Sequence, residues 1–157
     1  DAVIASMLIC EMVAYYKSEG KNLIDVLDSL YKKYGYFICS QLSFTCEGAS
    51  GMKQIMGIME NLRTNMPKEI AGSKVIKADD YEKSVSFDLV NNTETKITLP
   101  VSNVLCYYLE DGSSLIVRPS GTEPKIKLYL SAVGETNEKA EVKLKELEQS
   151  GTALLGF

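Results

Sequence analysis

The segment from Arg118 to Lys125, Arg-Pro-Ser-Gly-Thr-Glu-Pro-Lys, gathers more anion-binding groups than any other part of the chain. Arg118, one of only two arginines against fifteen lysines, can donate two parallel hydrogen bonds to a single phosphate group. Ser120 and Thr122 add hydroxyl donors, and Gly121 would allow successive backbone N–H groups to converge on one anion. These residue types at this spacing make the segment a candidate phosphate-binding loop.

Two other interpretations of the segment compete with phosphate binding. Proline, serine and glycine are ordinary turn formers, so the segment could simply connect two antiparallel strands. Ser120 and Glu123 also match the helix capping box S-x-x-E. A cap is excluded because Pro124 is followed by a strand pattern and no helix begins there. The residues themselves leave the plain turn and the phosphate loop both open.

Strands are predicted on both sides of this loop. Residues 115–117 precede it, and after it Ile126, Leu128, Leu130 and Ala132 alternate with polar or aromatic residues, which is typical of a strand with one buried face. Lys125 and Lys127 could add a second positive charge to the site. The alternation places both lysines on the face opposite to Ile126.

The remaining pattern predicts an α+β domain preceded by a helical hairpin. Residues 1–19 and 22–35 have helical periodicity, with Asn22 as a cap and Gly35 as an end. Ser50 is a candidate N-cap for a helix that ends before Pro67, and its stripe of methionines, isoleucine and leucine is interpreted as core rather than as a partner groove. Further strands are predicted over residues 36–46, 74–78, 85–89, 96–99 and 104–109, and a last helix runs from Thr136 to Gly151.

This order predicts a two-layer fold, a mostly antiparallel sheet with helices on one face. We expect residues 1–40 to be the end of a preceding domain and residues 41–157 to be the domain that carries the loop. The tail, residues 152–157, could pack back on the sheet or dock on a missing part. Asp1 opens directly onto a helix core without an initiator methionine, so the chain is expected to be the carboxy-terminal piece of a longer protein.

Composition excludes several classes of function. The formal net charge of -4 argues against a general nucleic-acid or anionic-membrane binder, because those proteins carry a basic field over a whole face. No apolar run approaches the roughly 20 residues of a membrane span. Histidine is absent, which removes Ser-His-Asp and Cys-His catalysis. The four cysteines form no C-x-x-C pair, and we interpret them as buried free thiols in a reducing compartment, the cytoplasm, with no metal bound.

The run R-P-S-G-T-E-P-K-I-K-L-Y-L resembles the phosphate-binding signature of the α-D-phosphohexomutases, the phosphoglucomutase and phosphomannomutase superfamily. The two amino-terminal helices, D-A-V-I-A-S-M-L-I-C-E-M and L-I-D-V-L-D-S-L-Y-K-K-Y-G, resemble the end of the third domain of that family. The resemblance therefore spans essentially the whole chain. It implies that the chain holds the last helices of the third domain and all of the fourth, a domain described as TATA-binding-protein-like.

The resemblance also implies a role for each loop residue. Arg118, Ser120, Gly121 and Thr122 would hold the substrate phosphate that is not being transferred. Lys127 stands where many family members have arginine. A phosphoserine and a Mg²⁺ ion held by upstream domains would perform the transfer between hexose 1-phosphate and hexose 6-phosphate through a hexose 1,6-bisphosphate, so the isolated chain is expected to be inactive.

Two alternatives to a mutase domain remain open from the sequence. The chain could be a stand-alone phosphate or nucleotide sensor that uses the same loop, or a sheet-and-helix interaction module. The resemblance implies that the sugar would be selected by a loop of the third domain that this chain does not contain. The expected partners are thus a phosphosugar and the upstream domains of the same polypeptide.

Overall fold

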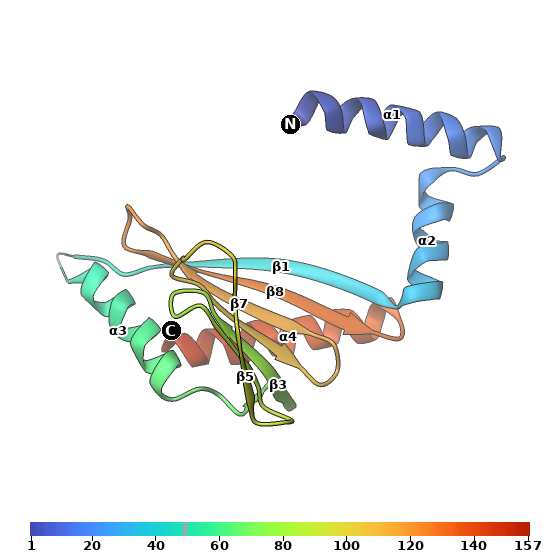
Figure 1. The fold of residues 1–157 in the computed structure, drawn as a ribbon. Coiled ribbons are helices and arrows are strands. Elements are labelled where there is room, and N and C mark those ends of the chain that lie inside the picture. Colours follow the sequence, from blue (N-terminus) through green and yellow to red (C-terminus); the bar gives the residue numbers. More distant parts are fainter. Residues whose placement is uncertain (49) are drawn as a thin grey trace. The chain divides into compact units, whose positions relative to one another are not determined.

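The computed structural model describes residues 1–48 and 50–157, which form four helices and eight strands (Figure 1). In chain order the elements are α1 (Ala2–Ser18), α2 (Leu23–Tyr34), β1 (Tyr36–Thr45), α3 (Gly51–Thr64), β2 (Glu69–Ile70), β3 (Ser73–Asp80), β4 (Val85–Asp88), β5 (Thr93–Lys96), β6 (Leu105–Leu109), β7 (Ser114–Pro119), β8 (Lys125–Gly134) and α4 (Asn137–Leu155). None of the helices in these described residues is both long and apolar enough to cross a membrane.

The chain divides into two compact units, Asp1–Tyr36 and Phe37–Phe157. The first unit contains the two helices predicted at the amino end. Asn22 caps α2 as expected, and Asp25 completes a capping box with it. Gly35 follows α2 with a φ of 94°, a conformation that favours glycine. No residue of α1 or α2 is buried within the described structure.

The second unit is built on an open sheet in the order β1-β8-β7-β6-β3-β4-β5, with β2 paired to β3. The pairs from β3 to β8 are antiparallel. At the other edge, the Cys46 N–H donates to the Pro124 carbonyl at 2.9 Å, while Cys39 contacts Ser131. Because the first contact joins the end of β1 to the start of β8 and the second joins more central residues, this pair is antiparallel too.

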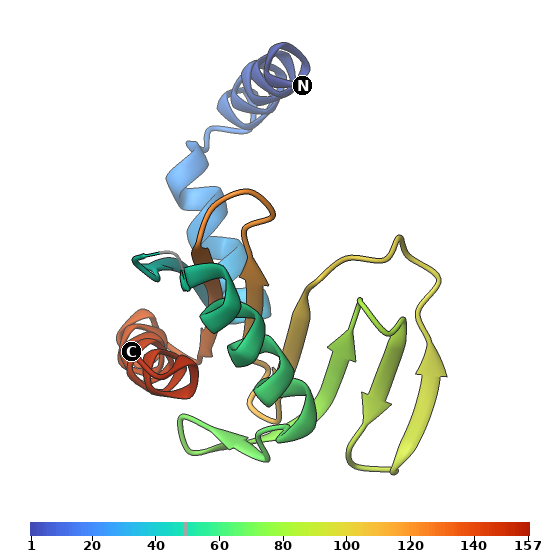
Figure 2. The same cartoon turned by 90° about the vertical axis from the view of Figure 1, so that its left-hand side faces the viewer.

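Both α3 and α4 pack on one face of the sheet, as the sequence predicted (Figure 2). A single core cluster joins Ile55, Met59 and Leu62 of α3 and Leu147 and Leu155 of α4 to the inward side chains of the strands. The β4–β5 hairpin extends beyond the helices (Figure 2), and every residue of β5 is exposed. The α+β class with helices on one sheet face is therefore confirmed.

Two predicted element boundaries were wrong. The strand after the Asn91-Asn92 turn is Thr93–Lys96 rather than 96–99, because the Asp88–Thr93 pair closes the hairpin earlier. The last helix does not end at Gly151. A Cβ on this buried glycine would lie 2.5 Å from Leu128 Cδ2, so Gly151 lets α4 approach the sheet rather than ending the helix.

The carboxy-terminal tail packs back on the second unit. The α4 helix continues to Leu155, which is buried. The Phe157 ring stacks on Phe44 of β1 with centroids 4.6 Å apart. Of the two arrangements left open by the sequence, the structure has the one in which the tail contacts the sheet.

Two further expectations need correction. Cys46 and Cys106 are buried free thiols as predicted, but Cys10 and Cys39 are exposed. No residue of α1, which contains Cys10, is buried in the described structure, and Cys39 lies on the exposed face of β1. Ser50 occupies the N-cap position of α3, yet its side chain makes no capping hydrogen bond.

Candidate phosphate-binding site

The candidate loop joins β7 to β8 at the end of a regular antiparallel hairpin. Register pairs run from Ser114–Ser131 to Pro119–Ile126 without a shift. Beyond them, the Ser120 N–H donates to the Lys125 carbonyl at 2.8 Å and closes the loop. The strands therefore hold both ends of the loop at a fixed separation.

The far end of the loop is held by β1 and α3. The Pro124 carbonyl accepts the hydrogen bond from Cys46. A Cβ on Gly51, the first residue of α3, would lie 2.1 Å from the Cys46 carbonyl oxygen and 3.0 Å from Pro124 Cβ. Only glycine fits this contact, which sets the start of α3 against the loop.

Ser120 organises the inside of the loop. Its Oγ accepts hydrogen bonds from the N–H groups of Thr122 at 3.4 Å and Glu123 at 3.3 Å. No helix begins after the loop, as the sequence predicted. The bond from the Glu123 N–H to Ser120 is nevertheless the one that the serine of a capping box would accept. Because the oxygen accepts both bonds, the hydroxyl hydrogen remains able to donate to a ligand.

Gly121 has open space around it. It is not among the glycines with positive φ, and a Cβ at this position would meet no atom within 4 Å. The backbone shape of the loop thus does not require glycine here. The space is available to a ligand that approaches the backbone closely.

The two candidate lysines have different surroundings. Lys125 forms an ion pair with Glu123 of the loop, with Nζ and the carboxylate 3.1 Å apart. Lys127 lies directly opposite Arg118 in the β7–β8 register. Within the described residues, neither Arg118 nor Lys127 forms an ion pair.

A cavity of about 300 Å³, here called the polar cavity, lies beside these two cations. It is lined by Arg118, Pro119, Ser120, Gly121, Thr122, Lys127 and Tyr129. All four residues singled out from the sequence for phosphate binding line it together with Lys127, whereas Lys125 is not among the lining residues. Tyr129 was missed, although its place two residues after Lys127 puts it on the same strand face.

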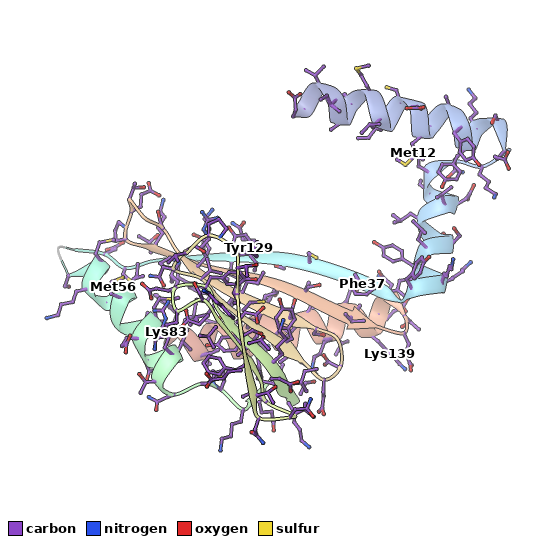
Figure 3. All side chains as sticks on the ribbon, in the orientation of Figure 1. Met12, Phe37, Met56, Lys83, Tyr129 and Lys139 are labelled. Atoms are coloured by element: carbon purple, nitrogen blue, oxygen red, sulfur yellow. The ribbon has the colours of Figure 1, made fainter. Side chains whose placement is uncertain are left out.

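A second cavity of about 330 Å³, here called the methionine cavity, lies on the α3 side of the loop. It is lined by Met52, Ile55, Met56, Ser102, Asn103, Val104 and Arg118–Gly121. The core interpretation of the α3 stripe holds for Ile55 and Met59 but not for Met52 and Met56, which are 40% and 48% exposed. Figure 3 shows Met56 on α3 and Tyr129 on the sheet.

The chain is similar in sequence to one family model and to several known proteins, and their names agree with one another. Residues 58–149 match the family model described as phosphoglucomutase/phosphomannomutase, C-terminal domain. The phosphoglucomutase of Staphylococcus haemolyticus is 40% identical over 131 residues, which cover 83% of this chain and 24% of that protein. The phosphoglucomutase of Staphylococcus aureus strain RF122 is 41% identical over the same shares.

A solved structure shares the fold. The open form of the exocytosis-sensitive phosphoprotein pp63/parafusin from Paramecium, titled a phosphoglucomutase, superposes with a TM-score of 0.65 over 99% of this chain, at 16% identity. This chain covers 27% of that protein, and it spans about a quarter of the length of the relatives named above. The chain belongs to the phosphoglucomutase/phosphomannomutase family, of which it carries the C-terminal domain.

Proposed function

We propose that residues 37–157 form the phosphate-binding domain of a phosphohexomutase, and that Arg118, Ser120, Gly121 and Thr122 hold the substrate phosphate that is not being transferred. The names of the relatives support the enzyme class. The observation that carries the site is the pairing of Arg118 with Lys127 across β7 and β8 at the wall of the polar cavity.

Charge balance favours an anion at this place. Like charges placed directly opposite on neighbouring strands repel each other. Lys125, two residues before Lys127, has an acidic partner in Glu123, whereas the ion pairs of the described residues include neither Arg118 nor Lys127. A phosphate between the two cations would satisfy both and would accept the hydrogen bond that Ser120 can donate.

The proposed contribution to the reaction is positioning. A mutase that works through a hexose 1,6-bisphosphate must accept its intermediate in two orientations, so one phosphate is held while the other reacts. A site made of a guanidinium, an ammonium and a hydroxyl recognises the phosphate and not the sugar. Binding energy from this remote phosphate can orient the reacting group and help exclude water when domains close.

We expect the transfer itself to depend on upstream domains that bind Mg²⁺ and carry a phosphoserine. The described residues contain no group of three or more His, Cys, Asp or Glu side chains that could hold a metal ion. The role of the residues of this chain is to bind and orient the phosphosugar.

Amide NMR of the ¹⁵N-labelled chain tests the proposal with inorganic phosphate as the probe. We expect saturable shifts of the Gly121 and Thr122 amides, with a dissociation constant of about 1 mM, equivalent to roughly 4 kcal/mol. Arg118→Ala should abolish the shifts, while Lys125→Ala should retain them because Lys125 is paired within the loop. Unchanged Gly121 and Thr122 signals in wild-type protein at tens of millimolar phosphate would overturn the assignment.

A further inference from the structure

The phosphate loop lies between the polar cavity and the methionine cavity and lines both of them. Arg118, Ser120 and Gly121 are the loop residues that line both cavities together with Pro119. A ligand held at the loop therefore has room to extend toward α3. The exposed sides of Met52 and Met56 form the apolar part of that space.

The side-chain orientation of Asn103, which lines this cavity, is fixed by a buried arginine. The Arg63 Nη2 donates to Asn103 Oδ1 at 2.5 Å. The Arg63 side chain is only 3% exposed, and it also pairs with Asp80 at 3.1 Å and with Glu82 at 2.7 Å. Because arginine can only donate, the amide oxygen of Asn103 must face Arg63. The amide NH₂ group is therefore turned the other way.

The NH₂ group of Asn103 has a weak partner on that side. Its nitrogen lies 3.8 Å from the Met56 sulfur, and a thioether is a poor acceptor. An amide nitrogen carries two donors, so a ligand oxygen entering the cavity would find at least one of them available. Methionine and valine side chains beside it suit the C–H surface of a sugar ring, and the amide suits a hydroxyl.

We propose that Asn103 is a further ligand-contacting residue, whose amide NH₂ donates to a hydroxyl oxygen of the sugar while the loop holds the phosphate. This inference rests on the proposed function. Arg63 is then a positioning residue, since it acts on the ligand only through the amide of Asn103. The loop would recognise the phosphate, and Asn103 in the cavity on the α3 side would contact a hydroxyl of the sugar attached to it.

Side-chain amide NMR separates the two parts of this assignment. Glucose 1-phosphate should shift the Asn103 NH₂ signals together with the Gly121 and Thr122 backbone amides. Inorganic phosphate should shift the two backbone amides and leave the Asn103 NH₂ signals in place. The side-chain amide of Asn137, which lies on α4 and bonds to Glu141, serves as the internal control.

The possible outcomes of this NMR experiment test the sugar contact of Asn103 and the phosphate site separately. If glucose 1-phosphate moves Gly121 and Thr122 but not the Asn103 NH₂ signals, the sugar contact is wrong and the phosphate site stands. If inorganic phosphate alone moves the Asn103 NH₂ signals as far as glucose 1-phosphate does, the residue contacts the anion and the sugar assignment is wrong. Unchanged Gly121 and Thr122 amides with both probes would refute the phosphate site itself.

Substitution provides a second measurement. Asn103→Ala should weaken the binding of glucose 1-phosphate about 3- to 10-fold, as expected for one hydrogen bond, and leave phosphate binding within about twofold. The fold should survive because Arg63 keeps Asp80 and Glu82. Asn137→Ala should bind both probes like the wild type. Equal weakening for both probes in Asn103→Ala would overturn the sugar contact.

Discussion

Arg118 and Lys127 lie directly opposite each other on the adjacent strands β7 and β8. Directly opposed side chains in an antiparallel pair share one sheet face, so two cationic side chains line the polar cavity from neighbouring strands. Neither belongs to an ion pair of the described residues. Repulsion between these two cations destabilises the folded domain when no ligand is bound. Such a locally unfavourable arrangement is expected at a site that binds an anion.

Neutralising Lys127 should therefore weaken phosphate binding without lowering the stability of the folded domain. In Lys127→Gln at low salt and without phosphate, we expect the free energy of unfolding to stay constant or rise by about 0.2–1 kcal/mol, because a repulsive pair is lost. The rise in melting temperature caused by added phosphate should shrink markedly, since the ligand stabilises only the folded state it binds. Thermal unfolding with and without phosphate measures both effects.

Lys125→Gln is the matched control for this experiment. Lys125 is in the same strand and has the same charge, but it pairs with Glu123. Its loss should change stability by less than about 1 kcal/mol, as for exposed ion pairs, and preserve the response to phosphate. A full phosphate response in Lys127→Gln, or its loss in Lys125→Gln, contradicts the distinction between the two lysines.

Arg118→Ala should impair the longer enzyme of which this domain is proposed to be a part. We expect kcat/KM for a hexose phosphate to fall by the equivalent of roughly 2–4 kcal/mol, in the range of buried charged hydrogen bonds. Arg118→Lys should recover only part of this loss, because an ammonium cannot form the bidentate contact. Steady-state kinetics provide the measurement, and a loss below about tenfold for Arg118→Ala rules out the proposed role.

The sequence predicted the parts of the fold that periodicity controls. Alternation after Pro124 placed Lys125 and Lys127 opposite to Ile126, and Ile126 is indeed buried. The β5 strand was misplaced because each of its residues, Thr93–Lys96, is exposed and has no apolar alternation to mark it. Local pattern is informative only where one face of an element is buried.

The details of the site depend on contacts that no local pattern contains. Which lysine stands opposite Arg118 follows from the β7–β8 register. The orientation of Asn103 depends on Arg63, forty residues earlier in the chain. The role of Gly51 depends on Cys46 and Pro124 together. The contacts of Arg63 with Asn103 and of Gly51 with Pro124 join residues that are distant in sequence. The β7–β8 register depends on how the loop between these strands folds. Residue types and spacing could therefore not reveal these relationships.

Substitution by alanine should affect stability differently at Gly51, which contacts the phosphate loop, and at Gly121, which lies within it. Gly51→Ala would force a Cβ to within 2.1 Å of the Cys46 carbonyl oxygen, so we expect a loss of about 1–3 kcal/mol in the free energy of unfolding, or more if the backbone cannot shift. Gly121→Ala meets no atom within 4 Å. It should leave stability constant or raise it by about 0.4–1 kcal/mol, yet weaken phosphate binding by filling the space beside the backbone.

Gly57→Ala provides the control for Gly51→Ala. Gly57 is in the same helix, and a Cβ there has nothing within 4 Å. Alanine at this position should stabilise α3 by up to about 1 kcal/mol, since glycine is a poor helix former. Urea unfolding and phosphate titration of the three variants check these expectations. Equal stability of Gly51→Ala and Gly57→Ala would disprove the close contact between α3 and the loop.

The Asp111 carboxylate should make the free energy of unfolding of the second unit depend on pH in the acidic range. Its carboxylate accepts hydrogen bonds from Ser73 Oγ at 2.6 Å and the Ser113 N–H at 2.9 Å, and it pairs with Lys143 of α4 at 2.8 Å. Partial burial alone raises the pKa of Asp111, but the hydrogen bonds from Lys143, Ser73 and Ser113 outweigh it and lower the pKa from 3.8 to about 2. The charged carboxylate is therefore a stabilising group of the folded state.

Because the folded-state pKa lies below the unfolded value of 3.8, this stabilisation is complete above about pH 4 and disappears as the pH falls toward about 2. Asp111→Asn should lower the free energy of unfolding at pH 7 by about 1 kcal/mol, allowing for partial exposure to solvent. The difference from wild type should shrink between pH 4 and pH 2. Glu146→Gln, on the exposed side of α4, should show no such convergence. Urea unfolding across this range measures it, and a constant difference between Asp111→Asn and wild type would mean that the Asp111 charge does not stabilise the fold.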